Sequence, residues 1–130
     1  NLITNNENQQ IKNYLFTLHT HKVRENLKKV MEEKFFYNIS LKEFAEISGR
    51  SLSTFKRDFK SVFGNTPGKW LLNKRILYSE ILLKTSDKSV SEIAFDSGFE
   101  NVSHFCRMFK KQFNSSPTDY RRSVMEFVLE

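Results

Sequence analysis

The feature that most constrains this chain is an internal repeat. Residues 40–67 and 89–117 align along their length once one extra residue is allowed after the second glycine. The matched positions hold a glycine, a serine, an arginine, three phenylalanines and a proline in both copies: Gly49 and Gly98, Ser53 and Ser103, Arg57 and Arg107, Phe55 and Phe105, Phe59 and Phe109, Phe63 and Phe113, Pro67 and Pro117. We therefore expect two similar small units.

Each copy has the signals of a helix, a turn and a second helix. A serine followed three residues later by a glutamate has the spacing of a capping box, which starts a helix. A glycine then lies where a helix ends in a left-handed residue, and a second N-cap residue follows it. These residues are Ser40, Glu43, Gly49 and Ser51 in the first copy, and Ser89, Glu92, Gly98 and Asn101 in the second. The sequence thus predicts a helix-turn-helix in each copy.

The second helix of each copy has one apolar, aromatic face and one polar face. The apolar residues are Leu52, Phe55, Phe59, Val62 and Phe63 in the first copy, and Val102, Phe105, Phe109 and Phe113 in the second. The outward residues recur at helical spacing and are Ser53, Lys56, Arg57 and Lys60, matched by Ser103, Cys106, Arg107 and Lys110. Such a helix is anchored by aromatic side chains and offers cations to a partner.

The remaining segments complete an all-α prediction. We expect residues 1–20 to be a linker or lead-in from an N-terminal domain outside the chain, polar to about residue 10 and then a short helix. A first helix from about residue 21 should pack on the first repeat, so that residues 21–66 form one helix-turn-helix subdomain. Residues 67–84 are apolar on nearly all sides, which predicts a buried, rigid connecting helix. Residues 85–130 form the second subdomain.

The charge of the chain is unevenly placed. The net charge is +6, which favours an anionic partner, with nucleic acid ahead of an acidic membrane surface. Seven cations and one acid lie between Arg50 and Arg75, and five cations and one acid lie between Asn101 and Arg122. The cations are Arg50, Lys56, Arg57, Lys60, Lys69, Lys74 and Arg75, then Arg107, Lys110, Lys111, Arg121 and Arg122. This excess on and after each second helix favours contacts with DNA phosphates.

Other classes of function find little support. A single cysteine, Cys106, excludes an internal disulfide framework and gives no zinc cluster. No carboxylate pair, catalytic triad or glycine-rich phosphate loop is visible, so we expect neither an enzyme nor a cofactor. No stretch reaches the roughly 20 apolar residues of a membrane span. The alternative to DNA is a helical protein-interaction module that binds an acidic partner. A steep loss of affinity with salt, together with preference for one base sequence, would favour DNA.

The second copy is similar to a known signature. Its residues read SEIAFDSGFENVSHFCRMFKKQFNSSPTDYRR, and the spacing of its Gly, Phe, Arg, Pro and Tyr-Arg positions resembles that of the AraC/XylS family of bacterial transcription regulators. The resemblance covers about residues 21–122. It implies two helix-turn-helix subdomains joined by a long helix, each with a recognition helix in the major groove of a double-stranded DNA operator. It further implies a cytoplasmic regulator, more often an activator, with RNA polymerase and an N-terminal sensor or dimerisation domain as partners.

The resemblance also assigns residues by position. The base-reading candidates are Ser53, Lys56, Arg57, Ser103, Cys106 and Arg107, and the phosphate-contact candidates are Ser51, Lys60, Asn101, Lys110, Ser115 and Ser116. Arg57 and Arg107 could read guanine, or could contact only phosphate or a carboxylate. The chain departs from the family pattern at Asn114, where a glycine is usual and where Asn still tolerates a left-handed turn. It departs again at Val102 and Cys106, which could meet thymine methyl groups or contact no base.

Overall fold

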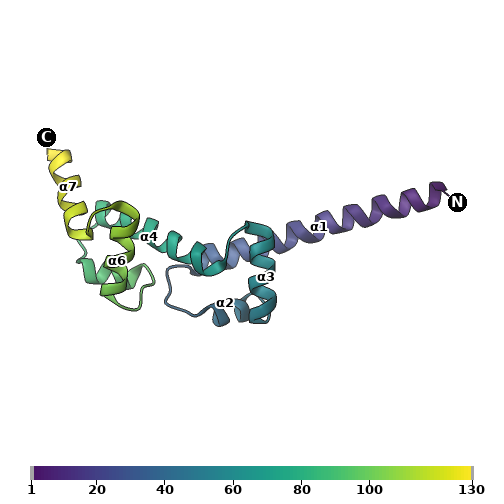
Figure 1. Cartoon of the computed structure of the whole chain (residues 1–130), viewed down its shortest axis with the longest axis horizontal. Coiled ribbons are helices and arrows are strands. Elements are labelled where there is room, and N and C mark those ends of the chain that lie inside the picture. Colours follow the sequence, from purple (N-terminus) through teal and green to yellow (C-terminus); the bar gives the residue numbers. More distant parts are fainter. Residues whose placement is uncertain (1, 130) are drawn as a thin grey trace. The chain divides into compact units, whose positions relative to one another are not determined.

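The regular structure of the chain is helical throughout the part that can be described. The computed structural model describes residues 2–129, with side chains for residues 5–127 (Figure 1). This confirms the predicted all-α class and the helix-turn-helix predicted in each copy of the repeat. The helices are α1 (Leu2–Lys34), α2 (Leu41–Ile47), α3 (Leu52–Phe63), α4 (Pro67–Thr85), α5 (Val90–Asp96), α6 (Val102–Phe113) and α7 (Pro117–Leu129).

The helices belong to two compact units. Unit 1 contains the chain up to Glu32 together with Leu41–Pro67, and unit 2 contains Glu33–Ser40 together with the chain from Gly68. The sequence predicts residues 67–84 as a connecting helix, and α4 has almost those bounds. From Gly68 onward, however, α4 is part of unit 2 and supplies side chains to its core.

The second helices begin and end as their sequences predict. The side chains of Ser51 and Asn101 accept hydrogen bonds from the backbone amides three residues later, at 3.2 and 2.7 Å. Gly49 and Gly98, with φ of 77° and 97°, occupy the left-handed conformation at the ends of the first helices. Asn114, with φ of 57°, ends α6 in the left-handed conformation that Gly64 adopts after α3. The repeat in the sequence is therefore a repeat in helix capping.

Each unit has its own aromatic core. In unit 1, Phe55 and Phe59 of α3 are fully buried with Phe44 of α2 and with Leu27 and Met31 of α1. In unit 2, the matched Phe105 and Phe109 are fully buried in one cluster with Ile76, Leu83, Ile93, Ala94 and Phe99. Tyr120 of α7 closes this cluster, since its ring centroid lies 5.4 Å from those of Phe109 and Phe113. The aromatic faces predicted for both second helices are confirmed.

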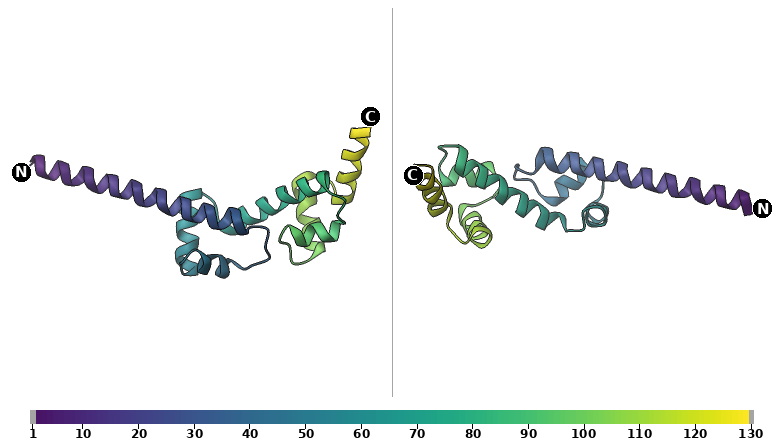
Figure 2. Two further views of the ribbon diagram at one scale, coloured as in Figure 1. Left: turned by 180° about the vertical axis from the view of Figure 1, so that it is seen from behind. Right: turned by 90° about the horizontal axis from the view of Figure 1, so that it is seen from above.

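The N-terminal segment differs from the prediction. Instead of a polar lead-in followed by separate helices, residues 2–34 form one unbroken helix (Figure 2). Polar side chains are satisfied along it, because the Gln9 amide donates to Asn13 and the Thr17 and Thr20 hydroxyls donate to carbonyls one turn earlier. Leu27 and Met31 are fully buried near one end of this helix, and each residue that extends a formed helix adds one backbone hydrogen bond.

The helix α4 also differs in its burial. Ile76 and Leu83 are buried, but Leu77 is 43% exposed and Ile81 is 54% exposed. Trp70, expected in the core, is only half-buried. The prediction of a buried helix was wrong for this side of α4, because Leu77 and Ile81 are partly exposed to solvent there. The Ser79 hydroxyl is buried but donates to the Ile76 carbonyl at 2.6 Å.

Candidate nucleic-acid interface

The outward face of α3 carries the first group of candidate residues. Ser53, Lys56, Arg57 and Lys60 are all exposed, on the side away from the buried Phe55 and Phe59. The Arg57 side chain is 75% exposed and its Nε lies 3.9 Å from Asp58 Oδ1, a long contact that holds the guanidinium weakly. Arg57 can therefore reach outward to a partner.

The outward face of α6 is similar but less polar. Ser103, Arg107 and Lys110 are exposed. Cys106 is half-buried and, like Val102, packs against the core cluster of unit 2. Burial raises the pKa of the Cys106 thiol, which favours its neutral form. The structure thus leaves Cys106 less accessible than Lys56, the residue at the matched position of α3.

The candidate phosphate contacts at helix starts already serve as caps. The side chains of Ser51, Asn101 and Ser116 each accept a hydrogen bond from a backbone amide of the helix that they precede. For Ser116 the donor is the Asp119 amide, at 3.1 Å. The Ser115 hydroxyl donates to the Ser116 carbonyl at 3.3 Å. Ser51 and Asn101 are exposed, whereas Ser115 and Ser116 are half-buried. A phosphate at these helix starts would meet backbone amides more readily than these side chains.

Some cations counted toward the basic surface are bound inside their unit. Arg50 of unit 1 forms a 3.0 Å ion pair with Asp58 and also donates to Asn26 and to the Ser48 carbonyl. Its side chain is only 14% exposed. The count of cations in the sequence therefore gave unit 1 more positive charge for a partner than the structure exposes.

Two arginines of unit 2 are also held by the fold. Arg75 donates to the carbonyls of Phe35 and Tyr37 at 2.7 and 2.9 Å, and its burial lowers the pKa of the guanidinium. Arg121 donates to three carbonyls at the end of α4 and in the turn that follows, with distances of 2.6 to 3.2 Å. Arg122 lies 3.3 Å from Asp119. Arg75 and Arg121 therefore stabilise unit 2 more than they extend its basic face, whereas Arg122 is exposed.

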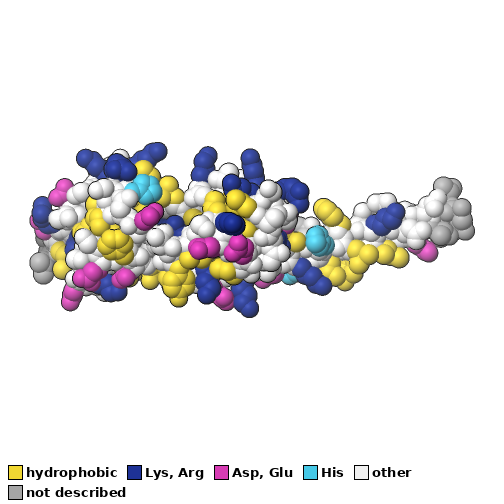
Figure 3. Space-filling view, turned by 90° about the horizontal axis from the view of Figure 1, so that it is seen from below, with side chains coloured by type: hydrophobic (Ala, Val, Ile, Leu, Met, Phe, Trp, Pro, Cys, Tyr) yellow, Lys and Arg dark blue, Asp and Glu magenta, His cyan; other side chains and the backbone are white. Residues whose placement is uncertain are grey.

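The remaining exposed cations still group together. Figure 3 shows Lys and Arg side chains along one edge of each unit, and others on the opposite edge beside Asp and Glu. Lys56, Arg57 and Lys60 on α3 and Arg107 and Lys110 on α6 are exposed, and Lys111 beside them is exposed too. Each unit therefore presents a helix with buried phenylalanines on one side and solvent-facing cations on the other, an arrangement that suits the major groove.

Comparisons with known proteins decide the family. Residues 44–123 match the family model described as a helix-turn-helix domain. One similar structure is the crystal structure of the DNA-binding domain of AdpA, a global transcriptional factor, in complex with a target DNA. Its sequence is 33% identical to this chain, and the two superpose with a TM-score of 0.69 over 78% of this chain and 90% of that one. An AraC-type regulator from Chromobacterium violaceum superposes with a TM-score of 0.66 at 25% identity, over 82% and 96%. The chain belongs to the AraC family of helix-turn-helix DNA-binding domains.

Curated relatives of this AraC-family domain are longer proteins. The virulence regulon transcriptional activator VirF of Yersinia enterocolitica is 36% identical over 97 residues, which are 75% of this chain and 36% of VirF. The regulator ExsA of Pseudomonas aeruginosa is 36% identical over 102 residues, 78% of this chain and 37% of ExsA. The chain thus spans about a third of the length of these relatives.

The structure adds one exposed cation to those assigned from the sequence, and it also bears on metal sites and membrane spans. Lys111 follows Arg107 by one helical turn, and its exposed position could have been read from helical spacing. Within the described residues of this AraC-family domain, no group of three or more His, Cys, Asp or Glu side chains lies close enough to hold a metal ion. Over the same residues, no helix is both long and apolar enough to cross a membrane.

Proposed function

We propose that this AraC-family domain is the sequence-specific DNA reader of a bacterial transcription regulator, with α3 and α6 as its recognition helices. The observation that carries this proposal is the shared design of the two helices, each with an N-cap, buried phenylalanines and outward cations. Successive major grooves on one face of B-DNA lie about 34 Å apart, so two readers on one chain suit a bipartite operator.

The residues divide into two roles. Ser53, Lys56 and Arg57 on α3, with Ser103 and Arg107 on α6, read base edges, and Cys106 contributes at most an apolar contact to a thymine methyl group. Lys60 and Lys110 contact phosphates, and so do the helix starts at Ser51, Asn101, Ser115 and Ser116. Arg57 is the strongest candidate for guanine, because its guanidinium is exposed and only weakly held.

The wider role of the protein follows from its relatives. VirF is named as a transcriptional activator, which supports activation rather than repression here. Activation would bring in RNA polymerase as a second partner, and a sensor or dimerisation domain would supply the signal. A regulator of this kind acts in the cytoplasm, where the chromosome lies.

The experiment that tests this proposal is selection of bound duplexes from a random library at two salt concentrations. Enrichment of two sequence blocks about one helical turn apart would support a bipartite reader. One enriched block would mean that one unit reads bases while the other holds only the backbone. Binding that shows no enrichment and disappears at higher salt would overturn the proposal and favour the alternative, a module for an acidic protein partner.

A further inference from the structure

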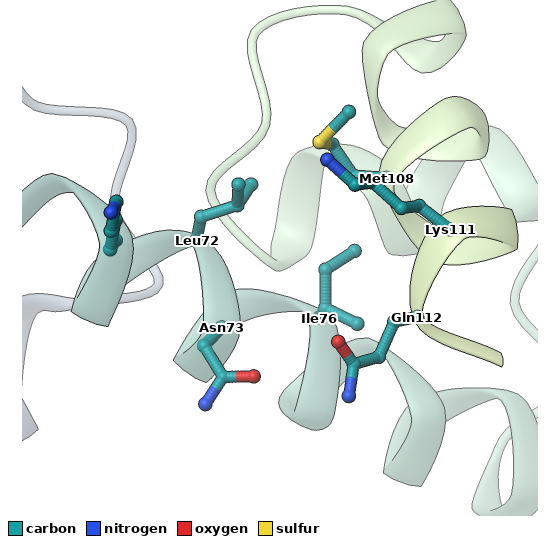
Figure 4. Close-up of a pocket in the computed structure, with 7 residues that line it drawn as sticks. Leu72, Asn73, Ile76, Met108, Lys111 and Gln112 are labelled. Atoms are coloured by element: carbon teal, nitrogen blue, oxygen red, sulfur yellow. The ribbon is translucent and has the colours of Figure 1, made fainter.

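Unit 2 contains a cleft that the proposed DNA contacts do not use. It lies between α4 and the flank of α6 and has a volume of about 310 Å³. Figure 4 shows Leu72 and Ile76 of α4 facing Met108 of α6, so the cleft has an apolar floor. A cleft of this size is at the lower end of those that hold small molecules, about 300–1,000 Å³.

The rim of the cleft is polar and positive. Lys69 of α4 and Lys111 of α6 both line it, and both are exposed. The amides of Asn73 and Gln112 supply the other polar groups, and no carboxylate is among the described residues that line the cleft. An apolar floor beside two cations matches a ligand that has an apolar body and an acid group.

The matched cleft of unit 1 has a different chemistry. It has a volume of about 190 Å³ and lies between α1 and α3. In the repeat, its α3 residues Asp58, Ser61 and Val62 take the positions of Met108, Lys111 and Gln112. Its α1 residues Phe16, His19, Thr20 and Val23 have the same spacing as Lys69, Leu72, Asn73 and Ile76. The positions of Lys69 and Lys111 hold Phe16 and Ser61 in unit 1, and a carboxylate, Asp58, stands at the position of Met108, so the pair of lysines belongs to the cleft of unit 2 alone.

We propose that the cleft between α4 and α6 binds a small amphipathic anion. Its apolar body packs on Leu72, Ile76 and Met108, and its acid group, a carboxylate, sulfonate or phosphate, lies between Lys69 and Lys111. Methionine suits such a site because its flexible thioether adapts to ligands of different shape. Binding of the anion does not require DNA, so this proposal can be tested independently of the proposed function.

A consequence for DNA binding rests on that proposed function. Lys111 follows Arg107 by one turn of α6 and adjoins Lys110, so a negative charge held at Lys111 lies beside the cations assigned to DNA. It opposes the approach of phosphates, and by linkage DNA opposes the binding of the anion to the same degree. The anion therefore lowers the affinity of the chain for DNA.

The methionines of the chain allow a direct test. The described ones are Met31, fully buried in unit 1, Met108 in the cleft, and Met125, 57% exposed on α7. With isotope-labelled methionine methyl groups, the whole chain is titrated by NMR with octanesulfonate below its micellar concentration. We expect a saturable shift of the Met108 signal alone. Equal shifts at all three methionines, or none at Met108, would overturn the proposal.

Further probes and variants separate the parts of the ligand and of the site. Methanesulfonate supplies the acid group alone and hexanol the apolar body alone, and both should bind more weakly than octanesulfonate. Lys111→Gln should weaken binding about two- to fivefold, the range for an exposed ion pair. Gln112→Glu, which places a carboxylate on the exposed rim, should weaken it further. Lys42→Gln removes the same charge from an exposed site on α2 and should have no effect; a loss equal to that of Lys111→Gln would refute the assigned site.

The coupling to DNA is measured separately. At saturating octanesulfonate, the affinity for the selected duplex should fall in the wild-type chain and fall less in Lys111→Gln. An unchanged DNA affinity would overturn the coupling. Failure of the chain to bind any duplex would overturn the proposed function, whereas the Met108 titration would still decide whether the cleft binds anions.

Discussion

The two helix-turn-helix units share their inner faces and differ at particular positions of their outer ones. Both second helices start at a capping side chain, end in a left-handed residue and bury two phenylalanines completely. On the outside, Lys56 of α3 is matched by the half-buried Cys106 of α6, and Asp58 by Met108. The buried phenylalanines thus repeat in both units, and so do the outward Ser, Arg and Lys positions, whereas these two outer positions have changed their chemistry.

This difference changes what holds each recognition helix. In unit 1, Asp58 receives the ion pair from Arg50, which ties α3 to the preceding turn and, through Asn26, to α1. In unit 2, Met108 takes the place of Asp58 and packs against the core, and Arg75 holds a different segment, the carbonyls of Phe35 and Tyr37. The same arrangement of helices is therefore stabilised by a polar link in one unit and by apolar packing in the other.

The largest expected effect tests whether the inner faces are equivalent. Phe59→Ala and Phe109→Ala each remove a fully buried ring, and each should cost about 3–5 kcal/mol of unfolding free energy through lost burial and a residual cavity. Urea unfolding followed by circular dichroism measures both. A cost below about 1 kcal/mol for either variant would mean that its unit repacks around the gap and that the two cores are not alike.

A second pair of variants compares the glycine turns of the two units. At Gly98, a Cβ would lie 2.7 Å from Arg75 Nε and 3.1 Å from the Phe35 carbonyl, whereas a Cβ at Gly49 would meet no atom within 4 Å. Both residues have positive φ. Gly49→Ala should therefore cost only the backbone strain, about 1–2 kcal/mol, and Gly98→Ala about 2–4 kcal/mol. Equal losses in thermal unfolding would show that Arg75 moves aside at little cost.

A third pair of variants compares the arginines on the outer faces of α3 and α6. Arg57→Ala should weaken binding to the selected duplex by about 1–3 kcal/mol and relax the preference at one base pair. Arg107→Ala provides the matched change on α6, where the neighbouring residues are more apolar. Binding measured across single-base variants of the duplex separates the two. An unchanged base preference in Arg57→Ala would refute its role in base reading, even if affinity fell.

Much of the fold could be predicted because its signals are local. Ser51 and Asn101 start helices through hydrogen bonds to residues three positions away, and Gly98 ends one through its own φ. The aromatic faces of α3 and α6 follow from spacing within a single helix. Such signals depend on neighbours in the sequence, so they can be recognised before the fold is known.

The errors concern residues whose partners are distant in the sequence. Arg75 resembles a surface cation, but it donates to carbonyls 38 and 40 residues earlier. Arg121 likewise bonds to carbonyls more than 30 residues away. A count of charges cannot separate such arginines from the exposed Arg57. The base and phosphate contacts themselves stay predictions, because they depend on the DNA.

The smallest expected effect concerns the lysines on the outer faces. Lys60→Ala and Lys110→Ala should each weaken binding to all duplexes by a similar factor and reduce the slope of log affinity against log salt by about one unit. Both side chains are exposed, so neither change should affect folding. Titrations at several salt concentrations, on the selected duplex and a scrambled one, measure the slope. A loss confined to the selected duplex would move that lysine from phosphate contact to base reading, and a loss in only one variant would show that the outer faces differ in how they hold the DNA backbone as well.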